Sequence, residues 1–284
     1  MKSQSAMEYL MTYGWAILII AVVLAVLFQL GVFSGGNFLP KAQAGSCQVS
    51  KTIAGVSLEG QCNGMLPEYV GQFNGNNGNI IISDSGTGFS LLRPENLTVS
   101  TWVYTTSSVA TQSMVAHGHQ GYGALTYELT TSDFCVTTSS SVCLVIGGIN
   151  KNTWYNVVGT VSYDGTNSII TAYVNGVQTA PMKNSGTLSY AYSTPLVIGQ
   201  GASGCCSFLD GYLTNVQIYN TSLSPSEVNA LYLEGIGGAP IRPQNLVGWW
   251  PLNGNTNDYS GNNNNGAQAS VTYSSSWESG YSAS

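Results

Sequence analysis

The longest apolar stretch of the sequence lies near its N-terminus. From Gly14 to Phe33 it reads GWAILIIAVVLAVLFQLGVF, in which Gln29 is the only strongly polar residue. About 20 apolar residues are enough for a helix to cross a bilayer. A secretory signal peptide would have a shorter apolar core, followed by a small-residue cleavage site. The pattern predicts a transmembrane helix over residues 4–33, and Lys2 ahead of it predicts that the rest of the chain lies outside the cell.

Beyond this helix the hydrophobic pattern changes to a period of two residues. Alternating segments occur at 97–104, 124–130, 154–162 and 169–176, and the turns between them are rich in Asn and Gly. Such alternation is typical of strands with one buried face, and Asn and Gly adopt the positive φ of tight hairpin turns. Many short strands at this spacing predict a β-sandwich over residues 69–236. Residues 34–68 form a linker, because SGGNFLP at its start ends the helix by glycine and proline.

Composition excludes several classes of protein. Only 7 Lys+Arg and 13 Asp+Glu occur in 284 residues, and the formal net charge is −6. The scarce basic residues leave no electrostatic footprint for nucleic acid. The sequence lacks G-x-S-x-G, H-E-x-x-H and P-loop motifs. The strand acids Glu128 and Asp210 are isolated, whereas glycoside hydrolysis needs a pair of carboxylates. The sequence therefore predicts a protein that is not an enzyme.

The extreme N-terminus carries a processing motif. It reads MKSQSAMEYLMTYGWA, with Lys2 and Ser3 directly before the helix. These residues resemble the class III signal sequence of archaeal type IV pilins, although Ser3 stands where Gly or Ala is commoner. The resemblance implies that a prepilin peptidase cuts between Ser3 and Gln4, so that residues 1–3 are a leader. Glu8 then occupies the fifth mature position, where pilins carry a Glu.

The spacing of Gln4 and Glu8 has a physical reason. Cleavage creates an α-ammonium at Gln4, and Glu8 lies one helical turn later. A carboxylate beside apolar sequence is costly unless it is paired. We expect Glu8 to neutralise the Gln4 ammonium of a neighbouring subunit when such helices pack in a filament. The alternative is that Glu8 is an interfacial residue of a monomeric anchor.

The predicted sandwich carries motifs in a recognisable order. They are FNGNNGNIII (73–82), LTVSTWVY (97–104), NTWYNVVGTV (152–161), AYVNGV (172–177), LVIG (196–199) and FLDGYLTNVQIYNTSLSPSEVNALY (208–232). This series resembles the laminin G-like, concanavalin A-like jelly rolls, which implies a mainly β jelly-roll sandwich that binds carbohydrate or protein, sometimes with calcium. In the last motif, Ser224, Pro225 and Glu227 predict the N-cap, first turn and capping box of a short helix.

One segment of that family is displaced along this chain. The family's usual first strand, which reads like LVxxWPL, is missing before Phe73 and occurs at 246–273 as LVGWWPLNGNTNDYSGNNNNGAQASVTY. We therefore predict a circularly permuted sandwich in which 237–245 is a linker, 246–273 completes the fold and 274–284 is a tail. The alternative is that 246–273 is donated to a neighbouring subunit.

The resemblance also implies a calcium site, for which the sequence has an alternative. Asp258 stands at the family's turn carboxylate, and Asn262 and Asn264 could add oxygen ligands. The family's second acid is replaced by Asn215, which weakens the case for calcium. The alternative is an Asx-turn in which Asp258 binds its own loop backbone. No other cofactor is expected.

The remaining candidates belong to an exported domain. Six cysteines favour disulfides, with Cys47–Cys62 and Cys135–Cys143 suggested by proximity and all pairings open. Asn96 (NLT) and Asn220 (NTS) are glycosylation sequons. His117 and His119 are interpreted as loop residues rather than metal ligands. Three tyrosines are candidates for stacking on sugars, and three tryptophans are expected in the core. The complete set is Cys47, Cys62, Cys135, Cys143, Cys205, Cys206, Asn96, Asn220, His117, His119, Tyr122, Tyr190, Tyr192, Trp102, Trp154 and Trp249.

Two functions stay open on this basis. The first is a structural subunit of an archaeal type IV pilus-like filament that displays its laminin G-like domain for adhesion or carbohydrate binding. Such a subunit would pass from the cell membrane to the extracellular filament, with prepilin peptidase, the assembly machinery and copies of itself as partners. The alternative is a membrane-anchored, lectin-like adhesin that does not polymerise.

Overall fold

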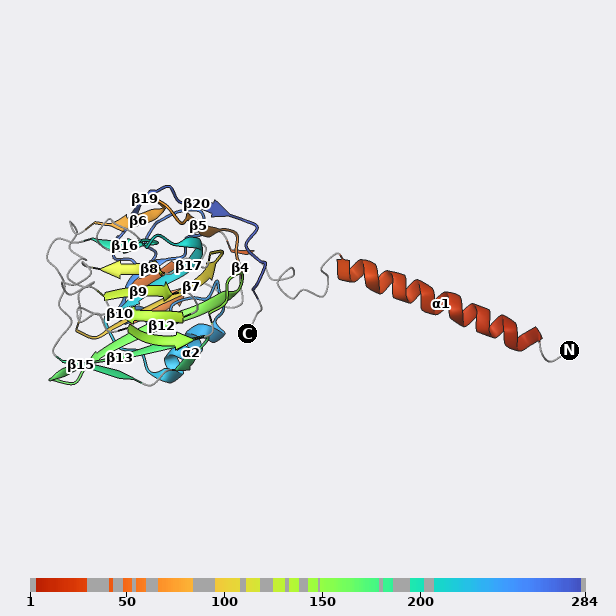
Figure 1. Cartoon of the computed structure of the whole chain (residues 1–284), viewed down its shortest axis with the longest axis horizontal. Helices are drawn as coiled ribbons and strands as arrows, with labels where there is room; N and C mark the ends of the chain where they lie inside the picture. Colours follow the sequence, from red (N-terminus) through yellow and green to blue (C-terminus); the bar gives the residue numbers. More distant parts are fainter. Residues whose placement is uncertain are drawn as a thin grey trace. The chain divides into compact units, whose positions relative to one another are not determined.

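The structure is a computed structural model of the chain, and Figure 1 shows its elements. It describes residues 4–29, 41–42, 48–52, 55–59, 66–83, 95–107, 111–117, 125–130, 133–137, 143–147, 149–178, 181–185, 195–201 and 207–281. By its contacts the chain divides near Pro40 into an N-terminal unit and a β-rich unit. Each unit is therefore considered by itself.

The N-terminal unit contains one helix, α1 (Gln4–Gln29). Its side chains are described from Tyr13 to Ala25, and all of them are exposed. Trp15 and Ile17, for example, are 67% and 65% exposed. Among the residues that the structure describes, no helix combines the length and apolar character needed to cross a membrane.

The β-rich unit contains two large sheets. Sheet I has the order β14 (Val177–Gln178), β13 (Asn167–Val174), β12 (Trp154–Tyr163), β7 (Leu97–Thr105), β17 (Asp210–Tyr219), β5 (Val70–Asn74) and β20 (Thr272–Ser274), with β15 (Met182–Ser185) beside β13 and β18 (Leu246–Trp250) beside β17. Sheet II has the order β11 (Cys143–Gly147), β10 (Asp133–Thr137), β9 (Leu125–Thr130), β8 (Thr111–His117), β16 (Leu196–Ile198), β6 (Asn79–Ile82) and β19 (Gly266–Ala269). Two short pairs, β1 (Lys41–Ala42) with β4 (Leu66–Pro67) and β2 (Gln48–Thr52) with β3 (Gly55–Glu59), complete the described strands.

The two sheets pack face to face around one apolar core. Val99 and Val103 of β7, with Leu213 of β17, meet Ile80 of β6 and Ile198 of β16 in the same cluster. Alternate residues of β7 supply this core, as the period-two pattern requires. The prediction of a mainly β sandwich is confirmed.

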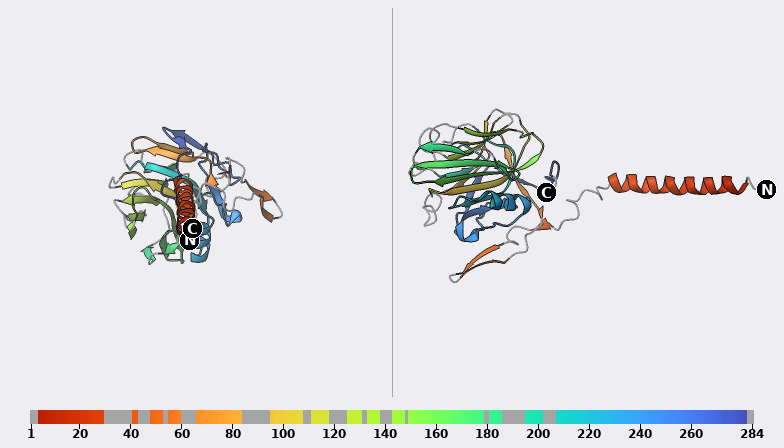
Figure 2. Two further views of the ribbon diagram at one scale, coloured as in Figure 1. Left: turned by 90° about the vertical axis from the view of Figure 1, so that its right-hand side faces the viewer. Right: turned by 90° about the horizontal axis from the view of Figure 1, so that it is seen from below.

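The outer face of sheet I is also covered. Helix α2 (Pro225–Leu233) lies over it, followed by the short 3₁₀ helix η3 (Pro243–Asn245). Val228 of α2 packs with Tyr219 of β17 and Trp249 of β18 in a second cluster. Because both faces are covered, every residue of β7 is buried. Figure 2 shows α2 on the side of sheet I that faces away from sheet II.

The C-terminal segment joins both sheets of its own chain. Strand β18 pairs with β17, β19 pairs with β6, and β20 pairs with β5. Residues 246–274 thus add hydrogen-bonded strands to sheet I and to sheet II. The displaced family segment is therefore part of the sandwich of its own chain, with β19 and β20 at the edges of the two sheets.

The residues after β20, which the sequence analysis named a tail, pack against the sandwich. Trp277 is 1% exposed, and its Nε1–H donates to the carbonyl oxygen of Pro67 over 3.2 Å. Trp154 Nε1–H donates to the carbonyl of Trp277 over 2.9 Å, and Tyr281 stacks edge-on against Trp102. Residues 275–281 therefore cover part of the outer face of sheet I. An isolated Trp gives no periodic pattern, so the sequence did not reveal this contact.

Candidate functional site

The turn between β18 and β19 is organised around Asp258. Its Oδ1 accepts hydrogen bonds from the backbone N–H groups of Trp249 (3.0 Å) and Ser260 (2.9 Å). Its Oδ2 accepts from the Ser260 hydroxyl (2.9 Å) and the Asn264 N–H (2.8 Å). A carboxylate has about four lone-pair sites. Donors of the loop and of β18 therefore occupy the hydrogen-bond acceptor sites of the Asp258 carboxylate.

The two asparagines predicted as calcium ligands point their side-chain nitrogens toward β18. Asn262 Nδ2 donates to the carbonyl oxygen of Val247 over 2.7 Å, and Asn264 Nδ2 donates to the same oxygen over 2.8 Å. Calcium needs oxygen ligands, usually six to eight of them. The hydrogen bonds of this turn favour the Asx-turn alternative, and the calcium site stays a prediction. Among the described residues, no group of three or more His, Cys, Asp or Glu could hold a metal ion.

Asn215, which stands where the family carries a second acid, belongs to a buried hydrogen-bond network. It lies at an irregularity of β17 with φ of +54° and is 6% exposed. Its Oδ1 accepts from Trp249 Nε1–H (2.7 Å) and Gln217 Nε2–H (2.9 Å), while its Nδ2 donates to Gly238 O (2.9 Å). Tyr219 Oη–H donates in turn to Gln217 Oε1 over 2.5 Å. Burial raises the pKa of the Tyr219 hydroxyl, so this donor keeps its proton.

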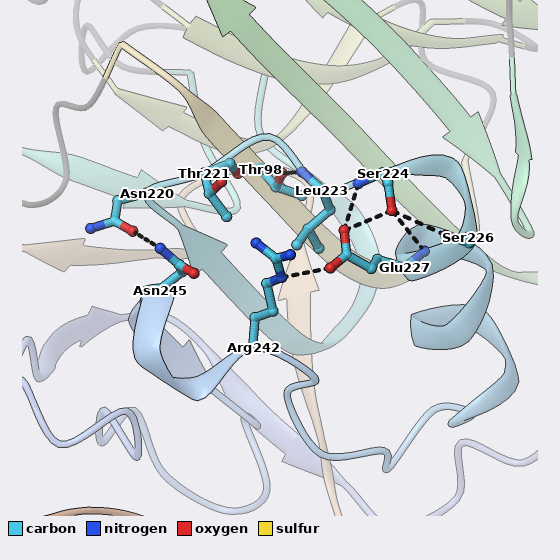
Figure 3. A network of polar contacts seen from close by, with 9 residues as sticks. All are labelled: Thr98, Asn220, Thr221, Leu223, Ser224, Ser226, Glu227, Arg242 and Asn245. Carbon is cyan, nitrogen blue, oxygen red and sulfur yellow. Dashed lines mark hydrogen bonds and ion pairs between the residues drawn. The ribbon is translucent and has the colours of Figure 1, made fainter. Parts of the chain in front are cut away.

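The start of α2 has the capping box that its sequence predicts. Glu227 N–H donates to Ser224 Oγ, and Ser224 N–H donates to Glu227 Oε2 over 2.8 Å. Glu227 also pairs with Arg242, which lies just before η3. Burial by itself raises the pKa of the Glu227 carboxyl, but the Ser224 donors and the Arg242 guanidinium outweigh it, so the pKa is lower than usual. Figure 3 shows that this network ties α2 to the chain leading into β18.

The two sequons lie at the ends of neighbouring strands. Asn96 is exposed just before β7, and its Oδ1 accepts from Tyr163 N–H over 2.9 Å. Asn220 is half-buried just after β17, and its Oδ1 accepts from Asn245 Nδ2 over 3.0 Å. Thr98, the third residue of the first sequon, is 0% exposed.

The structure places the other candidates as follows. Gln4 and Glu8 lie in the first part of α1, and Lys2 and Ser3 lie outside the described residues. Trp102, Trp154 and Trp249 are buried as expected, and His117 is buried in β8 rather than lying in a loop. Other candidates outside the described residues are Cys47, Cys62, Cys205, Cys206, His119, Tyr122, Tyr190 and Tyr192.

The backbone positions of Cys135 and Cys143 are described, on β10 and β11. The register pairs Cys135 with Val145 and Thr137 with Cys143, so the two cysteines are diagonal rather than directly opposite. Cβ atoms in a diagonal pair lie farther apart than those of opposite residues. The disulfide stays a prediction.

Comparison with known proteins identifies the fold family. A family model described as the concanavalin A-like lectin/glucanases superfamily matches residues 74–229. The chain belongs to this superfamily. A search of curated proteins gave no match. The matched residues run from the end of β5 into α2, so the superfamily match does not include β18, β19 and β20.

Solved structures agree on the superfamily fold. One is a Bacteroides ovatus ATCC 8483 protein assigned as carbohydrate binding, with a TM-score of 0.56 and 16% identity over 73% of this chain and 60% of that one. Another is the heptameric SAP-like pentraxin of Limulus polyphemus, with a TM-score of 0.51 and 17% identity over 72% of this chain and 94% of that one. The chain thus spans less than two thirds of the first of these proteins. At such identities the likeness shows the concanavalin A-like fold alone.

Within this superfamily fold, the described residues leave few apolar side chains exposed. The large exposed hydrophobic side chains of the β-rich unit are Ile81, Val177 and Leu233 among the described residues, and none is aromatic. Trp277 and Tyr281, which the sequence did not single out, belong to the packed outer face of sheet I. Trp102, Trp154, Trp249 and Trp277 are therefore used in the packing of the β-rich unit.

Proposed function

We propose that this protein is a subunit of an archaeal type IV pilus-like filament that carries a carbohydrate-binding sandwich on its outside. The observation that carries the proposal is the surface of α1. Its described side chains are exposed from Tyr13 to Ala25, and large apolar residues point to all sides of the helix. The apolar sequence continues to Phe33. Exposed apolar area costs about 25 cal/mol per Å² in water, so this helix requires an apolar environment.

Two environments meet that requirement at successive stages. A bilayer surrounds the helix before assembly, and the helices of neighbouring subunits surround it afterwards. Glu8 is the only acid in the sequence before Glu59. An unpaired carboxylate in an apolar bundle is costly, and the Gln4 ammonium of a neighbour would neutralise it. The need of Glu8 for such a partner is the reason that we propose a filament rather than an isolated anchor.

Carbohydrate binding is proposed for the sandwich on two grounds. The chain belongs to a superfamily that includes lectins, and a protein of the same fold from Bacteroides ovatus is assigned as carbohydrate binding. The sequence lacks a paired-carboxylate motif, which favours binding without hydrolysis. A glycan array probed with the detergent-solubilised full-length protein tests this proposal. Binding to a defined class of glycans without release of sugar is expected.

The filament proposal is tested at its N-terminus and at Glu8. Mass spectrometry of the native protein should find a chain that begins at Gln4, and electron microscopy should find filaments that contain it. Glu8→Gln should abolish filaments, whereas Glu95→Gln, which changes an exposed acid of the sandwich, should leave them intact. Filaments of normal abundance from the Glu8→Gln variant would overturn the pairing. Membrane-anchored wild-type protein that binds glycans without filaments would support the non-polymerising adhesin.

A further inference from the structure

The two sequons occupy one corner of the sandwich. Asn96-Leu97-Thr98 leads into β7, and Asn220-Thr221-Ser222 follows β17. The two strands are antiparallel neighbours, with Thr98 opposite Tyr219. The start of β7 and the end of β17 therefore meet at the same end of sheet I, although the two asparagines are 124 positions apart in the sequence.

Both asparagines can carry a substituent without loss of their folded contacts. In an N-linked glycan the sugar is joined to the side-chain nitrogen. The hydrogen bonds of Asn96 and Asn220 use the side-chain oxygen, which accepts from Tyr163 N–H and Asn245 Nδ2–H respectively. Figure 3 shows the amide nitrogen of Asn220 pointing away from Asn245. A sugar on Nδ2 of Asn96 or of Asn220 would therefore leave both of these hydrogen bonds intact.

Thr98 distinguishes the two sites. A transferase that recognises N-x-S/T must reach the hydroxyl of the third residue. In the folded chain Thr98 Oγ1–H donates to the carbonyl of Thr221 over 2.7 Å, and its oxygen accepts from Leu223 N–H over 2.9 Å. The side chain is 0% exposed. By contrast, Ser222 of the second sequon is half-buried, and its hydroxyl makes no hydrogen bond to another described residue.

We propose that Asn96 and Asn220 both carry N-linked glycans, and that Asn96 is modified before β7 and β17 pair. This inference rests on the proposed outward placement of the sandwich. The co-substrate is a lipid-linked glycosyl phosphate. A bond forms between C1 of the sugar and Nδ2, the bond from C1 to the donor's phosphate oxygen breaks, and the lipid phosphate leaves with the bonding electrons. Nδ2 releases one proton to solvent. Folding then buries Thr98 against Thr221 and closes the first site.

Occupancy is tested on the native full-length protein. Glycopeptide mass spectrometry should find sugar on the peptides that contain Asn96 and Asn220. Asn96→Asp keeps an oxygen for Tyr163 N–H, so it should remove one glycan without loss of folding, whereas Thr98→Ser should keep that glycan. The N-terminus is read in the same sample. An unmodified Asn96 in a chain that begins at Gln4 overturns this inference alone, while a chain that begins at Met1 counts against the proposed function.

The order of events is tested by when the transferase is supplied. Full-length chain is made without the transferase, folded in detergent and then given transferase and lipid-linked donor. In the comparison, both are present during translation. Asn96 is expected to be at least about tenfold less occupied in the first arm, because the folded state exposes Thr98 only through rare openings. Asn220 is expected to differ less between the arms. Equal occupancy of Asn96 in both arms would overturn the order, and no occupancy in either would overturn the site.

Discussion

The indole nitrogen of Trp249 lies 2.7 Å from the side-chain oxygen of Asn215 and donates a hydrogen bond to it. Trp249 comes from the displaced C-terminal segment, and Asn215 lies in β17, which the superfamily match includes. The same Asn215 oxygen accepts from Gln217, and its amide donates to Gly238. A carboxylate at this position would have no hydrogen to give to the Gly238 carbonyl. An amide at position 215 therefore fits this network, because Gly238 supplies an acceptor and Trp249 of β18 supplies a donor.

Asn215→Ala is expected to destabilise the sandwich by about 2–4 kcal/mol, since it leaves buried donors of Trp249 and Gln217 without an acceptor. The loss should appear in the free energy of unfolding measured by chemical denaturation. The matched control is Asn263→Ala, because Asn263 also has a positive φ, of +59°, but is exposed. It should cost only about 1 kcal/mol. Equal losses for the two variants would mean that backbone strain, and not the network, dominates.

Trp277→Ala is expected to cost about 3–5 kcal/mol, because it leaves a cavity where a fully buried ring packs. Trp277→Phe keeps one aromatic ring but removes the second ring and the bond from Nε1 to Pro67 O, so it should cost less, about 1–3 kcal/mol. Thermal unfolding followed by circular dichroism provides the measurement. An unchanged Tm for Trp277→Ala would show that residues 275–281 add nothing to the stability of the sandwich.

Asp258→Asn is expected to lower stability by about 2–3 kcal/mol whether or not calcium is present. The asparagine side chain has an NH₂ group in place of one carboxylate oxygen. This group would face N–H and O–H donors that now donate to the carboxylate. Unfolding is compared in excess calcium and in excess chelator, for the wild type and the variant. The wild-type Tm should be the same in both conditions. A calcium-dependent rise in Tm that the variant lacks would instead support calcium binding at this turn.

Glu227→Gln should lower the stability of the fold at neutral pH. On acidification the variant should lose less stability than the wild type. The pKa of the Glu227 carboxyl is lowered in the folded chain. A lowered pKa stabilises the fold above the unfolded value of about 4.3 and ceases to do so as pH falls through the folded value. The difference in Tm between wild type and variant should therefore shrink below about pH 4. Glu95→Gln, an exposed acid, serves as the control. A difference that is constant with pH would rule out the ionised carboxylate as the cause.

Local signals predicted the elements well. The period-two segments at 97–104 and 154–162 became β7 and β12, with ends that differ by at most one residue. Ser224 and Glu227 form the capping box that their spacing predicts. The signals succeed because alternation and capping depend on residues that are near each other in the sequence. The positive φ of Asn215 within a strand has no such signal, since only the partners brought by folding require it.

Long-range contacts were less accessible. Trp277 and Pro67 are 210 positions apart, and nothing near either residue indicates the other. The same holds for Thr98 and Thr221, whose bond decides when Asn96 can be modified. Asp258 shows an intermediate case, because its residue type suited both a calcium ligand and an Asx-turn. The four hydrogen bonds that Asp258 accepts favour the Asx-turn, and they form only when the loop is folded.

The sequence by itself determined the sandwich, the strands of its core and the capped helix, and it predicted an apolar N-terminal helix. These follow from periodicity and from the local hydrogen-bonding capacity of residues close together in the chain. Only the tertiary structure decided how residues 246–281 join both sheets and cover sheet I. It also decided which polar side chains form hydrogen bonds with this segment. Burial and hydrogen bonding between distant segments depend on which surfaces come into contact in the folded protein. Residues that are neighbours in the sequence do not specify these contacts.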